Sequence, residues 1–537
     1  MQQSYQVIIV GGGPVGMALA VELGQRGVDC AVVERHTGVG RIPKGQNLTQ
    51  RTLEHFYFWR CADQLRAARL LPPGYPIGGV TAYGDLMSEY WYTEKGREAI
   101  QSYYFQENER LPQYLTEAVL RARAAELPAV TCLFGWSATS VTQTGNGVRV
   151  AVTAQDPAAR EEPQAAREET LEAEYVVGCD GARSLVRELA GIARTGANFD
   201  QRMVLAVFRS GELHEGLKRF PDRTTYRVFR PENKGYWLFF GRVDVGERWF
   251  FHAPAGQNAS PGSADVHGLL ESAAGFPFSC EFDHIGFWDL RVEVASRYRD
   301  RRVFIAGDAC HSHPPYGGHG LNAGLEDAVN LGWKLAAELE GWGTDRLLDS
   351  YNSERQPVFE ETGQLIADRI GADAEFFKRY NPDRDRAEFE RAWDRMAGES
   401  AAIQSYEPHY EGSPVVWGPA DGACGVRGRH SFAARAGHHL APQPLSTGRN
   451  AFEELGPGFT LLAFDADQRS VAQLDLAARS LGVPLTIVRD RYDGERKLYE
   501  QPWILVRPDQ YVAWAADAPP ADALGLLRRV AGQAEPR

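Results

Sequence analysis

The chain has 537 residues, of which 43% are hydrophobic and 24% are charged, and its formal net charge at pH 7 is −13. At roughly 100–200 residues per domain, this composition and length indicate a globular protein of roughly two to four domains. The acidic balance, together with the lack of any Lys/Arg block, argues against nucleic acid as a partner.

Nothing in the sequence indicates export or a membrane span. Residues 1–5 are polar, residues 6–10 form only a short apolar run, and no stretch approaches the roughly 18 apolar residues that a spanning helix needs. The seven cysteines are scattered, and no Cys-x-x-Cys pair occurs. Reduced thiols explain this usage, so we expect a cytoplasmic protein with no membrane partner.

The first elements form a βαβ unit. Residues 6–10 are apolar and β-branched, which predicts a buried parallel strand, and a helix over 15–26 and a second strand over 30–33 follow. Between the first strand and the helix lies a Gly-x-Gly-x-x-Gly turn, and an acidic residue ends the second strand. A turn of this kind can be purely structural, but here strand, helix and acid are all in place.

This turn predicts a dinucleotide site. Gly11 permits the tight turn, Gly13 lets a pyrophosphate approach the backbone, and Gly16 lets the helix pack closely on the sheet. Glu34 is placed to accept the ribose hydroxyls. The flanking residues Pro14, Val15 and Arg35 are assigned to the same site.

The remaining elements alternate between helices and strands. Residues 200–252 alternate apolar and polar side chains with many aromatics, which is typical of an antiparallel sheet. A Pro/Gly/His-rich passage at 405–448 predicts a domain boundary. The other expected features, in chain order, are a helix over 110–126, a strand over 148–153, an exposed loop over 154–169, a strand over 175–180, a loop over 257–263, a strand over 302–308, helices over 321–339 and 350–377, and an α/β tail from residue 459.

Two further motifs separate FAD from other dinucleotides. Residues 178–187 read Gly-Cys-Asp-Gly-Ala-Arg-Ser-Leu-Val-Arg, and residues 306–322 read Ala-Gly-Asp-Ala-Cys-His-Ser-His-Pro-Pro-Tyr-Gly-Gly-His-Gly-Leu-Asn. With the first glycine motif, and in the same order, these segments resemble the group A flavoprotein monooxygenases, the family of para-hydroxybenzoate hydroxylase and phenol hydroxylase. The resemblance covers essentially the whole chain.

The resemblance implies FAD as cofactor and NADPH or NADH as co-substrate. It places Asp180 and Gly181 in contact with both FAD and the nicotinamide, Asp308 on the ribityl chain, and Gln113 on the flavin. Lys44 stands where the family usually has arginine, so a phosphate would meet a point charge without bidentate geometry. The free N–H groups at the start of the helix near Gly320, Leu321 and Asn322 would face the flavin N1–C2=O region and stabilise the anionic reduced flavin.

The expected fold class is α/β, with three parts. A doubly wound FAD-binding domain comprises residues 1–75, 100–190 and 280–400. An inserted antiparallel-sheet substrate domain comprises residues 76–99 and 191–279. Residues 401–537 form a C-terminal domain that resembles the thioredoxin-like third domain of the phenol hydroxylase subgroup, although without Cys-x-x-Cys it cannot perform thiol–disulfide exchange.

The substrate side is less determined. Gln46 lies near the position where phenol hydroxylases of this family often carry Asp or His, and glutamine can hydrogen-bond a phenol oxygen but cannot take its proton. His313, Tyr104 and Tyr236 are alternative candidates for a base, or the substrate is already ionised, as a nitrophenol, nitrocatechol or hydroxypyridine would be. The alternative for Gln46 is that it merely lines the pocket. His311 and His313 have no third ligand at a plausible spacing, so no metal site is expected.

The sequence thus predicts an FAD-dependent, NAD(P)H-consuming monooxygenase that hydroxylates a phenol-like ring with O2, through the flavin C4a-hydroperoxide that the resemblance implies. A flavin reductase or dehydrogenase and a tailoring hydroxylase of a polycyclic aromatic natural product remain alternatives. A flavin-dependent halogenase is disfavoured because no Trp-x-Trp-x-Ile-Pro segment occurs. A non-catalytic flavin-binding protein would leave the motif at Asp180 without a purpose. A homodimer stays open.

Overall fold

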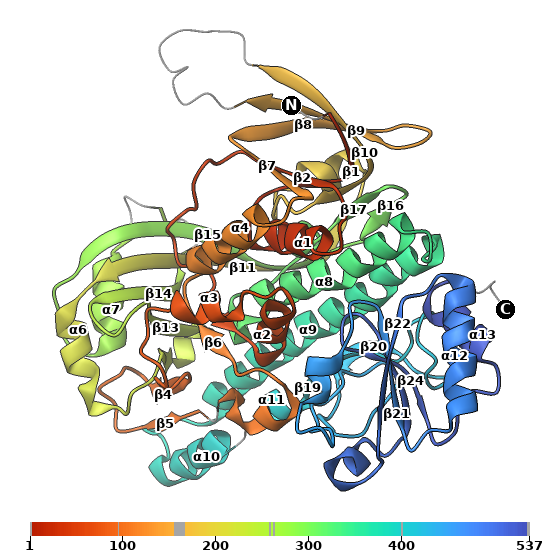
Figure 1. Ribbon diagram of the computed structural model, residues 1–537. Coiled ribbons are helices and arrows are strands. Elements are labelled where there is room, and N and C mark those ends of the chain that lie inside the picture. The colour runs from red at the N-terminus through yellow and green to blue at the C-terminus, as the bar shows by residue number, and fades with distance from the viewer. Residues whose placement is uncertain are drawn as a thin grey trace.

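Three sheets, each with its own hydrophobic core, organise the chain in the computed structural model (Figure 1). The structure describes residues 3–94, 96–154, 167–256, 259–260, 264–398 and 401–533. Most of the loop expected at 154–169, and most of the loop expected at 257–263, lies outside the described residues.

The first sheet has the strand order β16-β17-β10-β1-β2-β7, and β9 and β8 extend it from β10. The strands β17, β10, β1, β2 and β7 run parallel, while β16, β9 and β8 pair antiparallel. Their bounds are β1 Ser4–Val10, β2 Cys30–Glu34, β7 Val130–Phe134, β8 Trp136–Gln143, β9 Val148–Ala154, β10 Glu168–Gly178, β16 Arg299–Asp300 and β17 Val303–Ile305.

Helices cover this parallel sheet. The α1 (Pro14–Gly24) helix packs against both α4 (Gln113–Ala125) and α8 (His319–Leu339), which explains why its residues from Gly16 to Gly24 are all buried. Figure 1 shows α1 between the strands and α8. The sequence therefore predicted this βαβ unit correctly, because continuous apolar runs are typical of strands buried on both faces.

The second sheet has the order β18-β15-β11-β14-β13-β12-β4-β5. All neighbouring strands are antiparallel except β12 and β4. The bounds are β4 Gly79–Tyr83, β5 Trp91–Thr93, β11 Arg194–Arg209, β12 Thr225–Phe229, β13 Trp237–Arg242, β14 Arg248–Ala255, β15 Glu281–Ala295 and β18 His311–Ser312.

The two faces of this sheet have different partners. In β14, Trp249 and Phe251 point into a core that α7 (Val266–Ala274) and α6 (Gly211–Gly216) help to close, as Leu213 and Leu270 show. Phe250 lies on the opposite face, in a separate cluster. The alternation of side chains along the sequence arises because successive residues of a strand point to these two opposite faces.

The domain boundary expected at residue 280 needs correction. The strand β15 pairs with β11 along most of its length, and therefore belongs to the second sheet and not to the FAD-binding part. Most of its side chains are only partly buried, so its sequence lacks the clean alternation that marked residues 200–252. The short strand β18 extends the same sheet from β15.

Long helices follow α8. The α9 (Asp345–Arg379) helix contacts α8 and β15, and α10 (Arg386–Gly398) packs Phe389 and Trp393 against Tyr83 and Tyr92 of the second sheet. Short elements complete this part: β3 Asn47–Leu48, α2 Gln50–Phe58, α3 Ala62–Ala67, η1 Arg97–Tyr103, β6 Glu109–Arg110, α5 Leu185–Leu189, η2 Leu217–Arg219, η3 Pro231–Asn233, η4 Gly307–Ala309, η5 Tyr316–Gly318 and α11 Ala401–Ser405.

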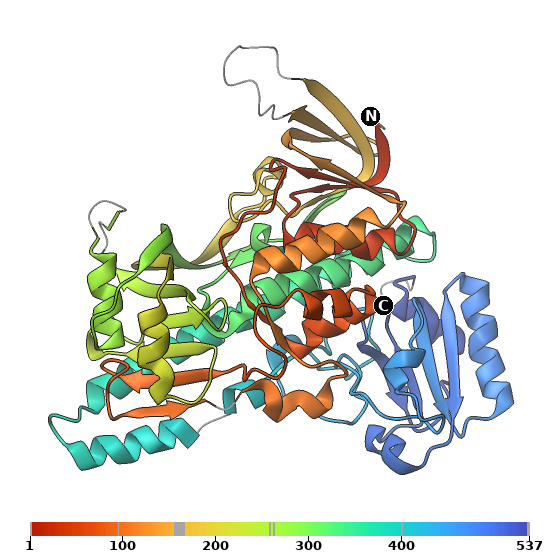
Figure 2. The ribbon, with the colours of Figure 1, turned by 60° about the vertical axis from the view of Figure 1, so that its left-hand side comes forward.

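The C-terminal part contains a sheet of order β22-β21-β23-β24, in which only β21 and β22 run parallel. Figure 2 shows it on the side of the molecule away from the antiparallel sheet. This arrangement agrees with the predicted thioredoxin-like domain. The bounds are β19 Tyr406–Tyr410, β20 Cys424–Arg427, η6 Ala451–Glu454, β21 Phe459–Phe464, α12 Gln468–Leu481, β22 Leu485–Asp490, η7 Gly494–Tyr499, β23 Trp503–Val506, β24 Val512–Ala516 and α13 Ala523–Val530.

The passage at 405–448 folds onto its neighbours. The β19–β20 hairpin packs against α9. All seven cysteines are free thiols. Among the described residues, no helix is both long and apolar enough to cross a membrane.

Candidate active site

The first glycine motif forms a tight cradle. Gly11 has φ 106°, and a Cβ there would meet the carbonyl oxygen of Cys179 at 2.4 Å, while a Cβ on Gly16 would meet the carbonyl oxygen of Gly11 at 1.9 Å. By contrast, a Cβ on Gly13 would have no atom within 4 Å. The turn is thus closed toward the protein and open at Gly13, which is the geometry a pyrophosphate needs.

The helix after this turn leaves its first N–H groups available. No side chain caps α1, whose N-cap is Gly13 and whose first residue is Pro14. The neighbouring Val15 packs against two other glycines, since a Cβ on Gly307 or on Gly324 would come within 2.9 Å or 2.7 Å of its Cγ2. An uncapped helix start of this kind stabilises an anionic phosphate.

Glu34 ends β2 beside the cradle. Its Oε2 accepts a hydrogen bond from the Gly12 N–H at 2.7 Å, and its Oε1 accepts one from the His36 N–H at 2.8 Å. These two bonds fix the carboxylate at the position where a ribose would bind. Arg35 is exposed and donates to the ring of His36.

The Asp180-Gly181 turn is held by hydrogen bonds. The Asp180 carboxylate accepts hydrogen bonds from the Ser184 hydroxyl and from the Val186 N–H, and thereby holds the start of α5. Burial raises the pKa of this carboxyl, against the lowering effect of these bonds. Gly181 has φ 83° and open space around it.

Asp308 behaves differently from a capping residue. Its carboxylate accepts no hydrogen bond from any residue that the structure describes, and the side chain is accessible to solvent although protein atoms surround it. This enclosure raises the pKa of the Asp308 carboxyl, while the charges of His311, Arg194 and Lys44 lower it. Because no side chain or backbone group among the described residues occupies this carboxylate, it is available to accept hydrogen bonds from the ribityl hydroxyls of FAD.

A buried ion network holds the Asp308 turn. Asp327, fully buried on α8, accepts from the Gly307 N–H at 3.1 Å and from Arg355 Nε at 2.7 Å, and its Oδ2 lies 2.7 Å from His311 Nε2. Burial raises the pKa of the Asp327 carboxyl, but His311 and Arg355 outweigh it and lower the pKa below its usual range. His311 is therefore a structural partner of Asp327.

Three distant segments of the chain meet at Gly45, where the side chains of Gln113 and Leu321 approach its backbone. A Cβ on Gly45 would contact Leu321 Cδ2 at 3.3 Å and Gln113 Oε1 at 3.4 Å. Gln113 is the first residue of α4, and Leu321 lies in the first turn of α8. The adjacent Lys44 is exposed and lies near enough to Asp308 to lower the pKa of that carboxyl. The structure thus brings these predicted flavin-side residues together.

The start of α8 is uncapped, like that of α1. Gly317 and Gly318 precede it with φ 71° and 68°, and no side chain caps the helix. The side chain of Asn322 bonds protein groups instead, since it accepts from the Thr49 N–H and donates to the carbonyl oxygens of Asn47 and Gly318. It fixes the loop at residues 47–49 to the helix. Gly320 lies next to His313, whose ring a Cβ there would meet at 3.7 Å.

The second sheet presents an aromatic wall to this region. Ile42, from the segment that leads to Gly45, packs against this face. Gln46 on the same segment is only 6% exposed, and neither polar atom of its amide has a partner among the described residues. The segment 42–46 thus lies between the wall and the start of α8. The wall and the side chains packed against it comprise Ile42, Leu205, Val207, Trp237, Phe239, Val243 and Phe250.

His252 of β14, which the sequence did not mark as a site residue, lies on the same face as Phe250. Its ring stacks on Phe239, with centroids 4.9 Å apart, and approaches Trp288 at 6.2 Å. Burial lowers the pKa of this imidazole to about 3, and Nδ1 has no hydrogen-bond partner in the described part of the chain. Because His252 follows Phe250 by two residues on one strand, the alternation could have indicated its face.

The other base candidates are poorly suited to take a proton. Burial lowers the pKa of His313 to about 4, its Nδ1 lies 2.5 Å from the Pro314 carbonyl oxygen, and its ring stacks on Phe359. Burial raises the pKa of Tyr236, which packs with Ile366 and Ile370, so its phenol stays protonated. Burial likewise raises the pKa of Tyr104, whose ring stacks on His439.

Comparison with known proteins agrees with this geometry. The family model "FAD binding domain" matches residues 4–365, and "Aromatic-ring hydroxylase, C-terminal" matches residues 434–534. Rifampicin monooxygenase of Streptomyces venezuelae is 30% identical, with 98% of each chain covered. The 4-methyl-5-nitrocatechol 5-monooxygenase of a Burkholderia species is 29% identical, with 98% of this chain and 97% of that protein covered.

A solved structure is similar over the same extent. The ternary complex of aklavinone-11 hydroxylase with FAD and aklavinone matches with a TM-score of 0.80 and 27% identity, over 98% of each chain. The cradle at Gly13, the unpartnered Asp308 and the convergence at Gly45 fit the pyrophosphate, ribityl and flavin parts of FAD. The chain is therefore an FAD-dependent aromatic-ring monooxygenase and belongs to the group A flavoprotein hydroxylases.

Proposed function

We propose that this monooxygenase consumes NADPH or NADH and O2 to hydroxylate a phenol-like ring, and that Gln46 holds the phenol oxygen. The observation that carries the proposal is the buried, unpartnered amide of Gln46, on the segment in which Ile42 packs on the aromatic wall and Gly45 lies beside Leu321 at the start of α8. A buried polar group without a partner costs about 1–3 kcal/mol. A phenolic oxygen at this position would accept from the amide and remove that penalty.

The substrate would arrive with an acidic or already ionised hydroxyl. Gln46 cannot take a proton, and the imidazoles of His252 and His313, with pKa values of about 3 and about 4, are weak bases. A nitrophenol, nitrocatechol or hydroxypyridine needs no base. The name of the Burkholderia relative, a nitrocatechol monooxygenase, supports this substrate class.

The protein's own residues would bind, orient and exclude water. The cradle at Gly11 to Gly16, Glu34 and Lys44 would hold the dinucleotide part of FAD, and Asp308 would hold the ribityl chain. FAD, when bound, supplies the electron transfer and the reaction with O2. Asp180 and Gly181 would contact the nicotinamide as well as FAD. The aromatic wall would keep the ring dry and in place.

A second candidate is the tailoring of a polycyclic aromatic natural product. The wall spans β11, β13 and β14, and His252 continues it to Trp288 on β15, so apolar side chains of four strands line this face. The aklavinone complex of a similar structure supports this candidate.

The test is steady-state NAD(P)H oxidation with two phenols of different acidity, a nitrophenol and an alkylphenol, across a range of pH. We expect the pH at which kcat/KM reaches half its maximum to follow the pKa of each phenol. If both phenols share one midpoint, and a single side-chain substitution abolishes it, a protein base exists and this account of Gln46 is wrong. A polycyclic phenol is tested in the same assay. If its KM is lower than the KM values of the two simple phenols, the second candidate is favoured.

A further inference from the structure

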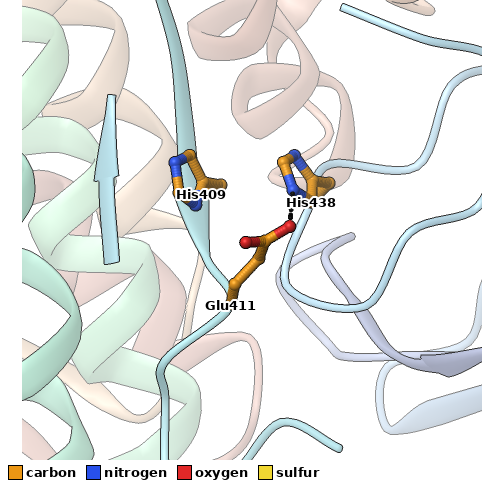
Figure 3. Close-up of side chains that lie close together, drawn as sticks. All are labelled: His409, Glu411 and His438. Atoms are coloured by element: carbon orange, nitrogen blue, oxygen red, sulfur yellow. Dashed lines mark hydrogen bonds and ion pairs between the residues drawn. The ribbon is translucent and has the colours of Figure 1, made fainter. Parts of the chain in front are cut away.

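A histidine–glutamate cluster that the flavin site does not use lies where the hairpin after α9 meets the C-terminal part. His409 is in β19, Glu411 directly follows that strand, and His438 lies on the loop that returns along β24 (Figure 3). One ligand atom from each of the three side chains can be chosen so that all lie within 4.8 Å of one another.

The backbone around His438 is firmly placed. The His438 carbonyl oxygen accepts from the Val512 N–H at 2.8 Å, and the Gly437 carbonyl oxygen accepts from the Tyr410 N–H at 2.7 Å. Gly437 has φ 87°, and a Cβ there would meet the Glu411 nitrogen at 2.4 Å. Only glycine permits this approach, which brings His438 next to Glu411.

The two ring nitrogens of His438 face two different carboxylates. Nδ1 lies 2.9 Å from Glu407 Oε1, and Nε2 lies 2.7 Å from Glu411 Oε1, while the residue is 3% exposed. If Nδ1 donates its proton to Glu407, Nε2 carries a lone pair that faces the Glu411 carboxylate oxygen. A lone pair and a carboxylate oxygen repel each other at this distance, so a proton or a metal ion has to lie between them. A carboxylate behind a histidine is also the usual way in which proteins orient a metal-binding imidazole.

His409 completes the group. Its ring is nearly parallel to that of His438, with centroids 4.9 Å apart, and its buried Nδ1 has no hydrogen-bond partner among the residues that the structure describes. Glu411 keeps 28% of its side chain exposed. One side of the cluster is therefore open for a water molecule and for entry of an ion.

We propose that His409, Glu411 and His438 bind a divalent transition-metal ion, with Zn²⁺ as the best match to two imidazoles and one carboxylate. Bonds of about 2.0–2.2 Å around a tetrahedral ion require ligand atoms roughly 3.5 Å apart. Rotation of the partly exposed Glu411 side chain would widen its 2.7 Å separation from His438 Nε2, and rotation of His409 would shorten the longer separations, which lie within 4.8 Å. The ion replaces the proton between His438 and Glu411, and a water takes the fourth position.

A metal ion at this site would link two segments of the chain, the β19–β20 hairpin and the loop at His438. His409 and Glu411 belong to the hairpin that packs on α9, whereas the backbone at His438 is hydrogen-bonded to β24 of the C-terminal sheet. A bound ion would therefore stabilise the docking of the C-terminal sheet on the rest of the chain. This role is structural and independent of the hydroxylation chemistry.

The test uses the full-length flavoprotein, freed of metal with a chelator, and calorimetric titration with Zn²⁺ near neutral pH. We expect one Zn²⁺ per chain and an increase in the unfolding temperature of the wild type on adding Zn²⁺. Glu411→Gln and His409→Gln should each weaken binding by about tenfold or more and abolish most of that increase. The FAD content of both variants, measured by absorbance, should equal that of the wild type, which establishes that they fold.

The control is His267→Gln. His267 and Glu271 form an exposed pair on α7, with Nδ1 and Oε2 3.8 Å apart, and the change should leave Zn²⁺ binding intact. Two results would overturn the proposal. One is the lack of Zn²⁺ binding by the wild type, in which case a proton joins His438 to Glu411. The other is equal binding by the wild type, Glu411→Gln and His409→Gln, which would place the ion elsewhere.

Discussion

His311 and Asp327 form a buried pair, with Nε2 and Oδ2 2.7 Å apart, and this pair fixes the turn that carries Asp308. The same Asp327 oxygen accepts from the Gly307 N–H, so the carboxylate joins the end of β17 to α8. The position of Asp308, which we propose binds the ribityl chain, is thus fixed by residues that lie behind it and would not touch FAD.

Asp327→Asn should lower both stability and FAD retention. The substitution removes the charge that His311 and Arg355 share, and breaking a buried pair on one side costs about 3–5 kcal/mol. The check is the free energy of unfolding in urea together with FAD content. Glu215→Gln, which breaks the exposed pair with Lys218, is the matched control and should change neither quantity. Equal losses in both variants would contradict the account.

Acid should weaken the fold through this same carboxylate. The folded-state pKa of Asp327 lies below that of the unfolded chain, so its contribution is fully present above the unfolded pKa of about 4 and is lost as pH falls through the folded pKa. Urea unfolding of wild type and Asp327→Asn between neutral and acid pH measures this contribution. We expect the stability difference between the two proteins to shrink in acid, and a constant difference would be the contrary result.

Gly13 and Gly11 should separate cofactor binding from folding. Gly13→Ala adds a Cβ with no atom within 4 Å, so the apoprotein should unfold at the wild-type temperature while FAD affinity falls, because the methyl group stands where the pyrophosphate approaches. Gly11→Ala, at φ 106° and 2.4 Å from a carbonyl oxygen, should destabilise the apoprotein itself. Flavin-fluorescence titration and thermal unfolding of the apoproteins check both outcomes. Unaltered FAD affinity in Gly13→Ala would place the pyrophosphate elsewhere.

Much of this site could be predicted from the sequence, for local reasons. A strand, a glycine turn and an acid at fixed spacing determine the cradle, because their geometry depends on neighbours in the chain. The meeting of Gln113, Gly45 and Leu321 depends on how distant segments pack, and only the resemblance to known hydroxylases indicated it. The sequence did not identify the partner of His311, because Asp327 lies on the next helix.

Other features could not be predicted from the spacing of residues along the chain. The alternation in β14 places Phe250 and His252 on one face but does not say which face meets the flavin side. The boundary at residue 280 was misplaced because β15 is only partly buried and lacks clean alternation. The pairing of His438 with Glu411 could not be predicted either, since the two residues are far apart in the chain and the close approach of Gly437 brings them together.

Gln46→Leu should separate stability from activity. Removing an unpartnered amide at a buried position should leave the free protein as stable as the wild type, or more stable by about 1–3 kcal/mol. The same change should raise KM for a phenol about tenfold, because a lost hydrogen bond to a charged oxygen is worth about 1.5–3 kcal/mol. Thermal unfolding and steady-state kinetics measure the two effects. A stability loss with KM unchanged would mean that the amide serves the fold.

His252→Phe should make the protein less sensitive to acid. With its folded pKa at about 3, His252 stays neutral in the native state and gains a proton on unfolding below pH of about 6.5. His252 therefore lowers the free energy of unfolding by up to about 1.4 kcal/mol for each pH unit as the pH falls from about 6.5 toward 3. Urea unfolding of both proteins across this window shows the difference, and parallel curves would contradict the neutral imidazole.

The most direct test of the central claim is turnover with NAD(P)H under ¹⁸O-labelled O2, followed by the mass of the product. The account predicts that a nitrophenol, nitrocatechol or polycyclic phenol stimulates NAD(P)H oxidation and gains one labelled oxygen for each NAD(P)H consumed. NAD(P)H oxidation that an aromatic stimulates, with all of the labelled oxygen recovered as hydrogen peroxide and none in any product of a broad phenol panel, would contradict the proposed hydroxylation.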